Sequence, residues 1–543
     1  MLLGRGAPSH PRGTPRVLFI KARVEQHGSD ACAPALGIMY LGAVARECGW
    51  DARCVDAYLE DDPETAIREA IAELEPRVIG LSALTSESKS MHRFARIARE
   101  AAPDAVVLAG GPHASAYAAD VLADPAIDGV VIGEGEVTLQ EILERLSFGK
   151  PWRDVAGIMA RGPDGNPVTN PSRPYVEDLD TLPLPAWDLT DVDAYSKRRG
   201  QSLAGLRRYM PLMTSRGCPY RCTYCHDIQG KRFRSHSPEY VLRLMDELGE
   251  RLSVFNFDII DDIFNFDAER MLAICDGIIE RRRKGAPIRF TFPNGVRADR
   301  LTPAQVDRLA QAGCEYAALA IETATKRLQK QIKKHLRFDK TLPVIEAFHR
   351  NDVFTAGFFM LGFPSETEAE VKDTIDFAVR SKLHAAFFFV VTPFQGTELH
   401  DEVASERSHE LPTDLTLLFA RQKINLSAVP DARFFALRRE AHVRFYFRPR
   451  RIASIWRAFP RRAHLLKLAF VMLTRDTLRL QPGALVEPVT RLRARMRRVV
   501  NGEAPRPARS PNAWRPIPAL LPEPGRRAHK RKLAVGVASE LTR

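Results

Sequence analysis

Apolar and polar positions between residues 16 and 150 follow two alternating periods. Short β-branched runs, such as RVLFI at 16–20, precede segments whose apolar residues recur every three or four positions. The pattern predicts strands at 16–20, 52–55, 78–81, 105–108 and 129–132, and helices at 36–48, 64–74, 91–101, 116–122 and 137–146. Five strands alternating with five helices are typical of a doubly wound, flavodoxin-like parallel sheet, which binds ligands beyond the carboxyl ends of its strands.

A second alternating pattern begins near residue 208. It predicts strands at 209–215, 254–259, 288–292, 316–321, 354–361 and 385–391, and helices at 238–251, 268–283, 303–312, 340–350 and 366–381. Six such units predict an open (β/α)6 barrel, with its site at the carboxyl ends of the strands.

These patterns divide the chain into six regions. We expect a disordered N-terminal tail at 1–15, a Rossmann-like domain at 16–150, a Pro-rich linker at 151–207, a barrel domain at 208–428, a basic helical region at 429–500 and a disordered basic tail at 501–543. A chain of 543 residues is long enough for several cores.

Charge is distributed unevenly along the chain. Residues 431–543 hold 27 Lys and Arg against 7 Asp and Glu, and the preceding 430 residues carry a net charge of −7. The basic tail therefore sets the net charge of +13, and no nucleic-acid partner is expected. Without an apolar signal segment or an uncharged apolar run of eighteen residues, the eight cysteines indicate a reducing, cytoplasmic setting.

Three of the cysteines lie close together directly after the first barrel strand. Cys218, Cys222 and Cys225 are spaced by four and three positions, in RGCPYRCTYCH. A zinc site needs a fourth ligand; Cys275 is fifty residues away, and His226 follows Cys225 too closely for good geometry. Three thiolates indicate a four-iron four-sulfur cluster with one open iron.

This loop, with Tyr224 before the last cysteine, resembles the signature of the radical S-adenosylmethionine superfamily. The resemblance implies that the cluster cleaves S-adenosylmethionine reductively to a 5′-deoxyadenosyl radical. It implies further contacts to this cofactor at the strand ends: Asp261 and Asp262 in DIIDDIF, Arg297, Glu322 in ALAIETAT, and Gly362 in FFMLGFPSET. The two aspartates also suit a helix N-cap, and Gly362 also suits a plain turn.

Glycines and hydroxyl residues follow the strands of the first domain. The segments GLSALTSES, AGGPHAS and VIGEGE resemble the cobalamin-binding domain found ahead of many radical S-adenosylmethionine domains. By that resemblance the corrinoid contacts lie at Ser82, Thr85, Gly110, Gly111, His113, Gly133, Glu134 and Gly135. The Asp-x-His-x-x-Gly pattern that supplies a cobalt ligand is absent, because His27 has the wrong spacing, so the corrinoid is expected base-off. A vestigial domain that binds nothing is the alternative.

The basic region shows helical spacing at 434–447 and 452–473. Its most apolar stretch, LLKLAFVML at 465–473, is too short to span a bilayer. Packing on the barrel is the expected role, and lining the substrate site or peripheral membrane contact are the alternatives.

The resemblance implies a cobalamin-dependent methyltransferase that acts on an unactivated carbon of a small or lipid-like substrate. It also implies an external one-electron donor of the flavodoxin or ferredoxin type. A cobalamin-dependent cyclase or ring-rearranging enzyme, similar to the anaerobic cyclases of chlorophyll synthesis, is a second interpretation. A non-catalytic cobalamin or redox sensor is a third, from another class.

Overall fold

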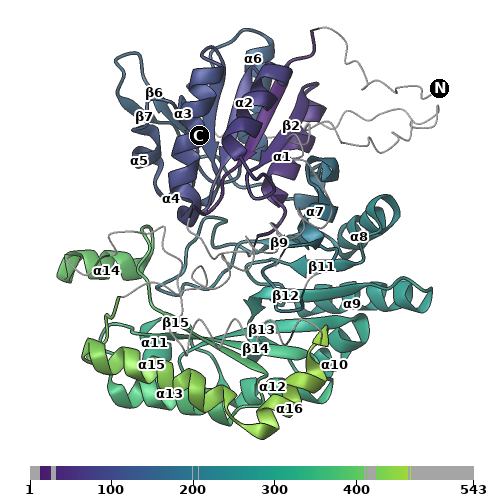
Figure 1. Cartoon of the computed structure of the whole chain (residues 1–543), viewed down its shortest axis with the longest axis vertical. Helices are drawn as coiled ribbons and strands as arrows, with labels where there is room; N and C mark the ends of the chain where they lie inside the picture. Colours follow the sequence, from purple (N-terminus) through teal and green to yellow (C-terminus); the bar gives the residue numbers. More distant parts are fainter. Residues whose placement is uncertain are drawn as a thin grey trace, which may run out of the picture.

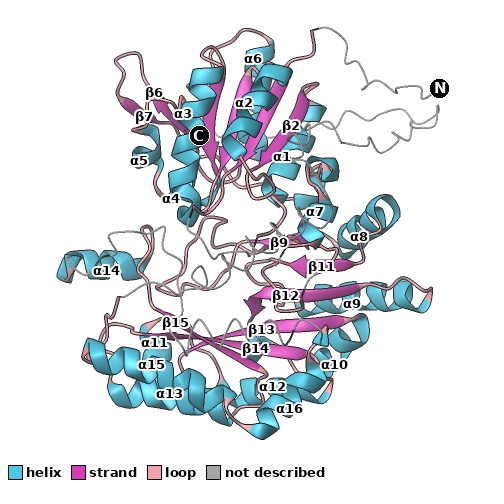
Figure 2. Ribbon diagram, in the orientation of Figure 1, coloured by secondary structure: helices cyan, strands magenta, loops and turns pink. Residues whose placement is uncertain are grey.

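The computed structural model describes residues 13–25, 32–198, 200–205, 207–408, 411, 424–462 and 465. Figure 1 shows two α/β units stacked along the long axis, the first in purple and blue above the second in teal and green. Loops from both units meet between the two sheets (Figure 2). The predicted α/β fold class is confirmed by two separate, mainly parallel sheets.

The first sheet has the order β2-β1-β3-β4-β5-β6-β7. Its strands are β1 (Arg16–Lys21), β2 (Asp51–Asp56), β3 (Val78–Ser82), β4 (Val106–Gly110), β5 (Gly129–Val131), β6 (Ile158–Arg161) and β7 (Pro167–Thr169). The first five are parallel, as predicted, and the last two pair antiparallel. Part of the expected linker thus extends the sheet, because β6 pairs with the edge strand β5.

Helices cover both faces of this sheet: α1 (Leu36–Glu47), α2 (Pro63–Leu74), α3 (Ser88–Ala101), α4 (Gly111–Ala116), α5 (Ala118–Leu122) and α6 (Glu136–Ser147). Their apolar faces are buried in two clusters, which include Leu18, Ile79, Phe94 and Ile142. The short helix α7 (Val192–Ser196) follows, and its Tyr195 hydroxyl donates to Asp56 at the end of β2.

The second sheet has the order β15-β14-β13-β12-β11-β8, and all neighbours are parallel. Its strands are β8 (Met210–Leu212), β11 (Asn256–Ile259), β12 (Arg289–Val296), β13 (Cys314–Glu322), β14 (Phe354–Leu361) and β15 (Ala385–Val390). The intervening helices are α8 (Pro238–Leu252), α9 (Ala268–Arg283), α10 (Pro303–Ala312), α11 (Lys326–Gln331), α12 (Phe338–Arg350) and α13 (Glu368–Arg380). β8 and β15 form the two edges, as an open barrel requires.

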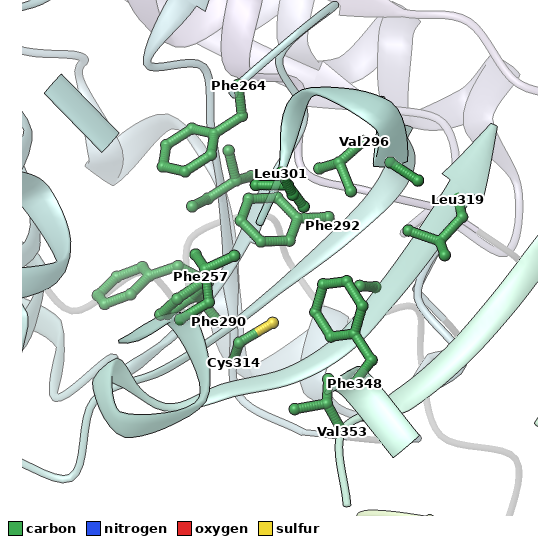
Figure 3. Packing of buried hydrophobic residues seen from close by; sticks show 14 of the residues in the cluster. Phe257, Phe264, Phe290, Phe292, Val296, Leu301, Cys314, Leu319, Phe348 and Val353 are labelled. Atoms are coloured by element: carbon green, nitrogen blue, oxygen red, sulfur yellow. The ribbon is translucent and has the colours of Figure 1, made fainter. Parts of the chain in front are cut away.

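The largest core lies between this sheet and its helices. Figure 3 shows the aromatic side chains of Phe257, Phe290 and Phe292, from β11 and β12, packed with Phe348 of α12 and aliphatic neighbours. Leu36, Met39 and Tyr40 of α1 also belong to this cluster. The first domain therefore contributes side chains to the core of the second.

In the described part of the chain after the barrel, the helices are α14 (Glu398–Glu406), α15 (Asp431–Tyr446) and α16 (Pro449–Ala458). Phe434, Leu437, Ala441 and Phe445 bury one stripe of α15, which packs against α13 and β15. Helix α15 thus packs on the barrel, whereas His27, 466–473 and 501–543 lie outside the described residues, and with them all but the first residue of the stretch 465–473 for which packing was expected. No helix in the described ranges is long and apolar enough to cross a bilayer.

Candidate functional site

The three clustered cysteines lie on one loop between two short paired strands. β9 (Ser215–Arg216) and β10 (Arg234–Ser235) pair antiparallel and enclose residues 217–233, which we call the cysteine loop. Gly217 opens the loop with φ of +79°, and a Cβ atom there would lie 2.3 Å from the Arg232 carbonyl oxygen. Only glycine fits both the left-handed backbone and this close approach.

All three thiols are free of disulfide bonds. Cys218 and Cys222 are half-buried, and Cys225 is exposed as a whole residue although protein atoms surround its thiol. Burial, and then the nearby Cys222, raise the pKa of the Cys225 thiol to about 12, and burial also raises the pKa of Cys218. Among the described residues, no three His, Cys, Asp or Glu side chains converge on a single metal ion.

The donor set suits an iron–sulfur cluster. Three thiols on one loop match the ligands that such clusters use, and each thiolate of a four-iron cluster binds a different iron. The loop is held from both sides: the Thr223 N–H donates to the Ile332 carbonyl and the Leu399 N–H donates to the Thr223 carbonyl, at 3.2 and 2.8 Å. Cys218, Cys222 and Cys225 are thus the residues that would hold the cluster.

The two aspartates after β11 have different surroundings. Asp261 is buried, and its carboxylate accepts from the Thr214 N–H, the Thr214 hydroxyl and the Ser215 hydroxyl, at 2.5 to 2.6 Å. It therefore fixes the strand that leads into the cysteine loop. Asp262 is exposed and accepts from the Gly217 N–H at 3.1 Å. Of the two, Asp262 has the carboxylate available to a cofactor.

A buried ion pair lies at the end of β13, next to the cysteine loop. Glu322 has φ of +67°, and its carboxylate accepts from the Lys334 ammonium at 2.9 Å. The same ammonium lies 3.3 Å from the Tyr224 hydroxyl, and burial raises the pKa of Tyr224 well above its usual value. Lys334 was not predicted, because no motif distinguishes it from the adjacent Lys333.

Arg297 joins this group from the end of β12. Its guanidinium lies 3.9 Å from the centre of the Tyr220 ring and donates to the Lys334 carbonyl at 2.6 Å. Arg297 thus supports both the cysteine loop and the segment that carries Lys334. The structure brings Arg297, Glu322 and Tyr224 together, as expected for side chains at the carboxyl ends of parallel strands.

Gly362 lies in the turn after β14. The N–H groups of Gly362 and Phe363 donate to Glu366, at 2.6 and 3.1 Å, and the second carboxylate oxygen of Glu366 is buried without a partner. Burial raises the pKa of Glu366 to about 7. The Phe363 ring lies 5.9 Å from that of Tyr224, so this turn packs against the cysteine loop.

In the first domain, the predicted residues after β3 and β4 lie side by side. Gly111 has φ of +89°, and a Cβ atom there would lie 3.0 Å from the Ser82 hydroxyl oxygen. His113 stacks on Tyr117, and its Nδ1 atom is buried without a hydrogen-bond partner. Burial lowers the pKa of His113 to about 4, so the ring is neutral at pH 7. An open imidazole nitrogen at this edge suits a polar ligand such as a corrinoid with its amide side chains.

Thr85 and Gly133 complete the predicted set at this edge. Thr85 begins a 3₁₀ turn, Thr85–Glu87, whose Glu87 pairs with Lys21 at the end of β1. The Gly133 N–H donates to the Ser115 hydroxyl at 3.0 Å. Glu134 is different, because its carboxylate pairs with Arg216 and Arg234 of the second domain. Its observed partners are thus protein groups.

Comparison with known proteins agrees with this arrangement. The family model "B12 binding domain" matches residues 28–143, and "Radical SAM superfamily" matches residues 212–378. An uncharacterized methyltransferase of Pyrococcus horikoshii is 28% identical over 427 residues, covering 77% of this chain and 88% of the relative. An anaerobic magnesium-protoporphyrin IX monomethyl ester cyclase of Rubrivivax gelatinosus is 26% identical, covering 72% and 70%.

A solved structure has the same fold. The radical S-adenosylmethionine methyltransferase TsrM from Kitasatospora setae, with cobalamin and a [4Fe-4S] cluster bound, aligns with a TM-score of 0.62. The identity is 19%, and the alignment covers 72% of this chain and 78% of TsrM. Together these matches cover both units of the fold and their order along the chain. The chain therefore belongs to the subclass of the radical S-adenosylmethionine superfamily whose members carry a B12-binding domain ahead of the radical domain.

Proposed function

We propose that this radical S-adenosylmethionine enzyme is a cobalamin-dependent methyltransferase that acts on an unactivated carbon of a small or lipid-like substrate. One observation carries the proposal: the cysteine loop is anchored, through Arg216 and Arg234, to the loop that follows β5 at the carboxyl edge of the first sheet. This anchoring supports a corrinoid site and an iron site that adjoin one another. Methyl transfer from a corrinoid to a substrate radical needs this proximity.

The groups of this chain hold and orient the cofactors. When bound, the cluster, S-adenosylmethionine and the corrinoid supply hydrogen abstraction and a methyl group. Cys218, Cys222 and Cys225 hold the cluster in this proposal. Lys334 and Asp262 provide opposite charges for the carboxylate and amino groups of S-adenosylmethionine. Phe363 packs against Tyr224 of the cysteine loop, and the two rings exclude water there.

The iron site is tested first by anaerobic reconstitution. The protein is expected to take up about four irons per chain, and Cys222→Ala is expected to lose them. Cys275→Ala is the matched control, because Cys275 is a packing residue buried in α9. Retention of the iron by Cys222→Ala would contradict the assignment of Cys222 as a cluster ligand.

Methylation and cyclisation are distinguished by whether the methyl group of S-adenosylmethionine enters the product. The similarity to the Rubrivivax cyclase keeps a ring-forming reaction as the second candidate. Uptake of hydroxocobalamin, followed by absorbance, separates a functional corrinoid domain from a vestigial one. With methyl-labelled S-adenosylmethionine, a methyltransferase passes the label to its product and a cyclase does not. Release of 5′-deoxyadenosine under an electron donor of the flavodoxin or ferredoxin type excludes a non-catalytic sensor.

We also propose that the C-terminal end of α15, together with α16, contacts an anionic membrane surface. Nine large hydrophobic side chains are exposed in the described part of the chain, and four of them lie between residues 443 and 456. These are Val443, Phe447, Ile452 and Trp456, exposed by 46%, 62%, 56% and 48%. Arginines 448, 450 and 457 lie among them, and this combination suits an acidic lipid surface.

Vesicle sedimentation tests this surface. The full chain is expected to sediment with phosphatidylglycerol vesicles and not with phosphatidylcholine vesicles, because the arginines require anionic lipid. Ile452→Glu with Trp456→Glu should abolish sedimentation. Phe148→Glu is the control, because Phe148 is exposed by 76% at the C-terminus of α6, outside this patch. Equal sedimentation of all three proteins would contradict a membrane role for this face.

A further inference from the structure

Two arginines at the base of the cysteine loop converge on one loop of the first domain. Arg216 and Arg234 are direct partners in the β9–β10 pair, so they stand at the two ends of the cysteine loop. Residues 134–136, which we call the Glu-Gly-Glu loop, lie between β5 and α6. Arg216 pairs with Glu134 at 3.2 Å and with Glu136 at 2.6 Å, and Arg234 pairs with Glu134 at 2.9 Å.

All four charges are buried. The side chains of Arg216 and Arg234 are 7% and 3% exposed, and those of Glu134 and Glu136 are 10% and 7% exposed. Two positive and two negative charges balance, so the group is neutral as a whole. Removal of either acid would leave two buried guanidinium groups with a single carboxylate between them, which is far less favourable than the intact set.

Other groups complete the surroundings of both arginines. The Arg216 guanidinium lies 5.5 Å from the centre of the Tyr40 ring of α1, and that of Arg234 lies 4.8 Å from the Tyr175 ring. Arg234 also donates to the Gln229 carbonyl, inside the cysteine loop, at 2.9 Å. The ion cluster therefore sets the position of both ends of the cysteine loop and of part of its interior.

The Glu-Gly-Glu loop also adjoins the ligand edge of the first sheet. The Gly133 N–H, one residue before Glu134, donates to the Ser115 hydroxyl of α4 at 3.0 Å. α4 carries His113, whose Nδ1 atom is buried and unpartnered. A ligand that contacts α4 at this edge would therefore affect the position of Glu134, because the Ser115–Gly133 hydrogen bond links α4 to the segment next to Glu134.

We propose that Glu134 and Glu136 are positioning residues for the cysteine loop, and that their ion cluster with Arg216 and Arg234 couples occupancy of the corrinoid site to that of the iron site. The inference rests on the proposed function, because it requires both cofactors. Binding of one then favours binding of the other by the same factor in either direction.

The test compares corrinoid affinity with and without the cluster. The dissociation constant for hydroxocobalamin is measured by absorbance titration on iron-free and on anaerobically reconstituted full-length protein. In the wild type, the cluster is expected to tighten binding by about fivefold or more, the usual lower range of coupling between sites. In Glu134→Gln combined with Glu136→Gln, the ratio of the two constants is expected to fall to about one.

Two further variants make the result specific. Glu141→Gln removes an acid of α6 that pairs with Arg145 and Arg173 within the first unit, and it should keep the wild-type ratio. If the double variant does not fold, Glu136→Gln alone leaves Glu134 with both arginines and should give an intermediate ratio. A general loss of structure would raise the dissociation constants of both the iron-free and the reconstituted protein and would leave their ratio unchanged.

The outcomes separate the inference from the proposed function. A wild-type ratio near one, with both cofactors bound, overturns the coupling and leaves the proposed function intact. A double variant that keeps the wild-type ratio also overturns it. A wild type that takes up no iron or no corrinoid overturns the proposed function, and the coupling with it.

Discussion

At the scale of single residues, the site depends on buried charges whose partners are distant in the sequence. Glu322 and Lys334 are 9% and 8% exposed and pair with each other, whereas the adjacent Lys333 is 50% exposed and pairs with Glu398 at the surface. The printed sequence shows only two consecutive lysines. Burial decides which of them matters, because a buried ion loses its hydration and needs its partner.

Replacement of Lys334 by Met should therefore destabilise the protein. The Glu322 carboxylate would stay buried without a cation, and the expected loss in free energy of unfolding is about 3–5 kcal/mol. Lys333→Met is the matched control and should cost less than about 1 kcal/mol, because its ion pair is exposed. Urea unfolding of both variants measures the difference, and equal losses would contradict the assignment.

Glu366 predicts a dependence on pH. Its pKa is raised by burial from 4.5 to about 7, so the folded state holds a proton that the unfolded state has released between these values. The stability from this group is complete below pH 4.5 and is lost as the pH rises through 7. Glu366→Gln imitates the protonated form. It should match the wild type near pH 5 and be more stable above pH 7, by up to about 3 kcal/mol.

Thermal unfolding at pH 5 and pH 8 checks this expectation. The difference in midpoint between variant and wild type should grow with pH. Glu368→Gln is the control, because its carboxylate is far more accessible and pairs with Arg433 and Lys372, so no gain at high pH is expected. A difference that is constant with pH would show that Glu366 titrates normally.

At the scale of elements, the cysteine loop is shaped by its two strands and by one glycine. β9 and β10 are only two residues long, so their pairing depends on what surrounds them. Gly217 allows the Arg232 and Gly230 carbonyl groups to approach its Cα atom closely. The sequence predicts the cysteines but not this hairpin, because two-residue strands leave no periodic pattern.

Gly217→Ala should therefore disturb the loop. The added Cβ atom would lie 2.3 Å from a carbonyl oxygen, and the left-handed backbone adds about 1–3 kcal/mol of strain. Iron uptake on anaerobic reconstitution is expected to fall clearly below that of the wild type. Gly149→Ala is the control, because Gly149 also has a positive φ but has open space around its Cα atom. Normal iron content in Gly217→Ala would mean that the cysteine loop tolerates the added Cβ atom.

At the scale of the whole molecule, the two units share a core. Leu36, Met39 and Tyr40 of α1 belong to the same apolar cluster as Tyr240 and Leu244 of α8. The Tyr209 hydroxyl, next to β8, donates to the Cys32 carbonyl at 2.9 Å. The interface thus combines apolar burial with polar links, which favours one orientation of the two sites.

Because the two units share a core, calorimetry of the full chain should show a single unfolding transition. Met39→Lys places a charge in the shared cluster and is expected to split the transition or to lower its midpoint strongly. Glu47→Lys on the exposed side of the same helix should leave the transition unchanged. Two separate transitions in the wild type would mean that the units unfold independently.

Both parallel sheets, the order of their strands along the chain and the loop that carries the three cysteines were predictable from the sequence alone. Local periodicity and residue spacing are properties of nearby residues, so they are readable without the fold. The contacts of Asp261 and Glu134 could not be predicted in this way, because their partners lie 42 to 100 residues away. That Asp261 holds a strand in place, that Lys334 joins the site and that Glu134 pairs with the arginines flanking the cysteine loop depends on the fold, since burial and long-range charge pairing arise when distant segments meet.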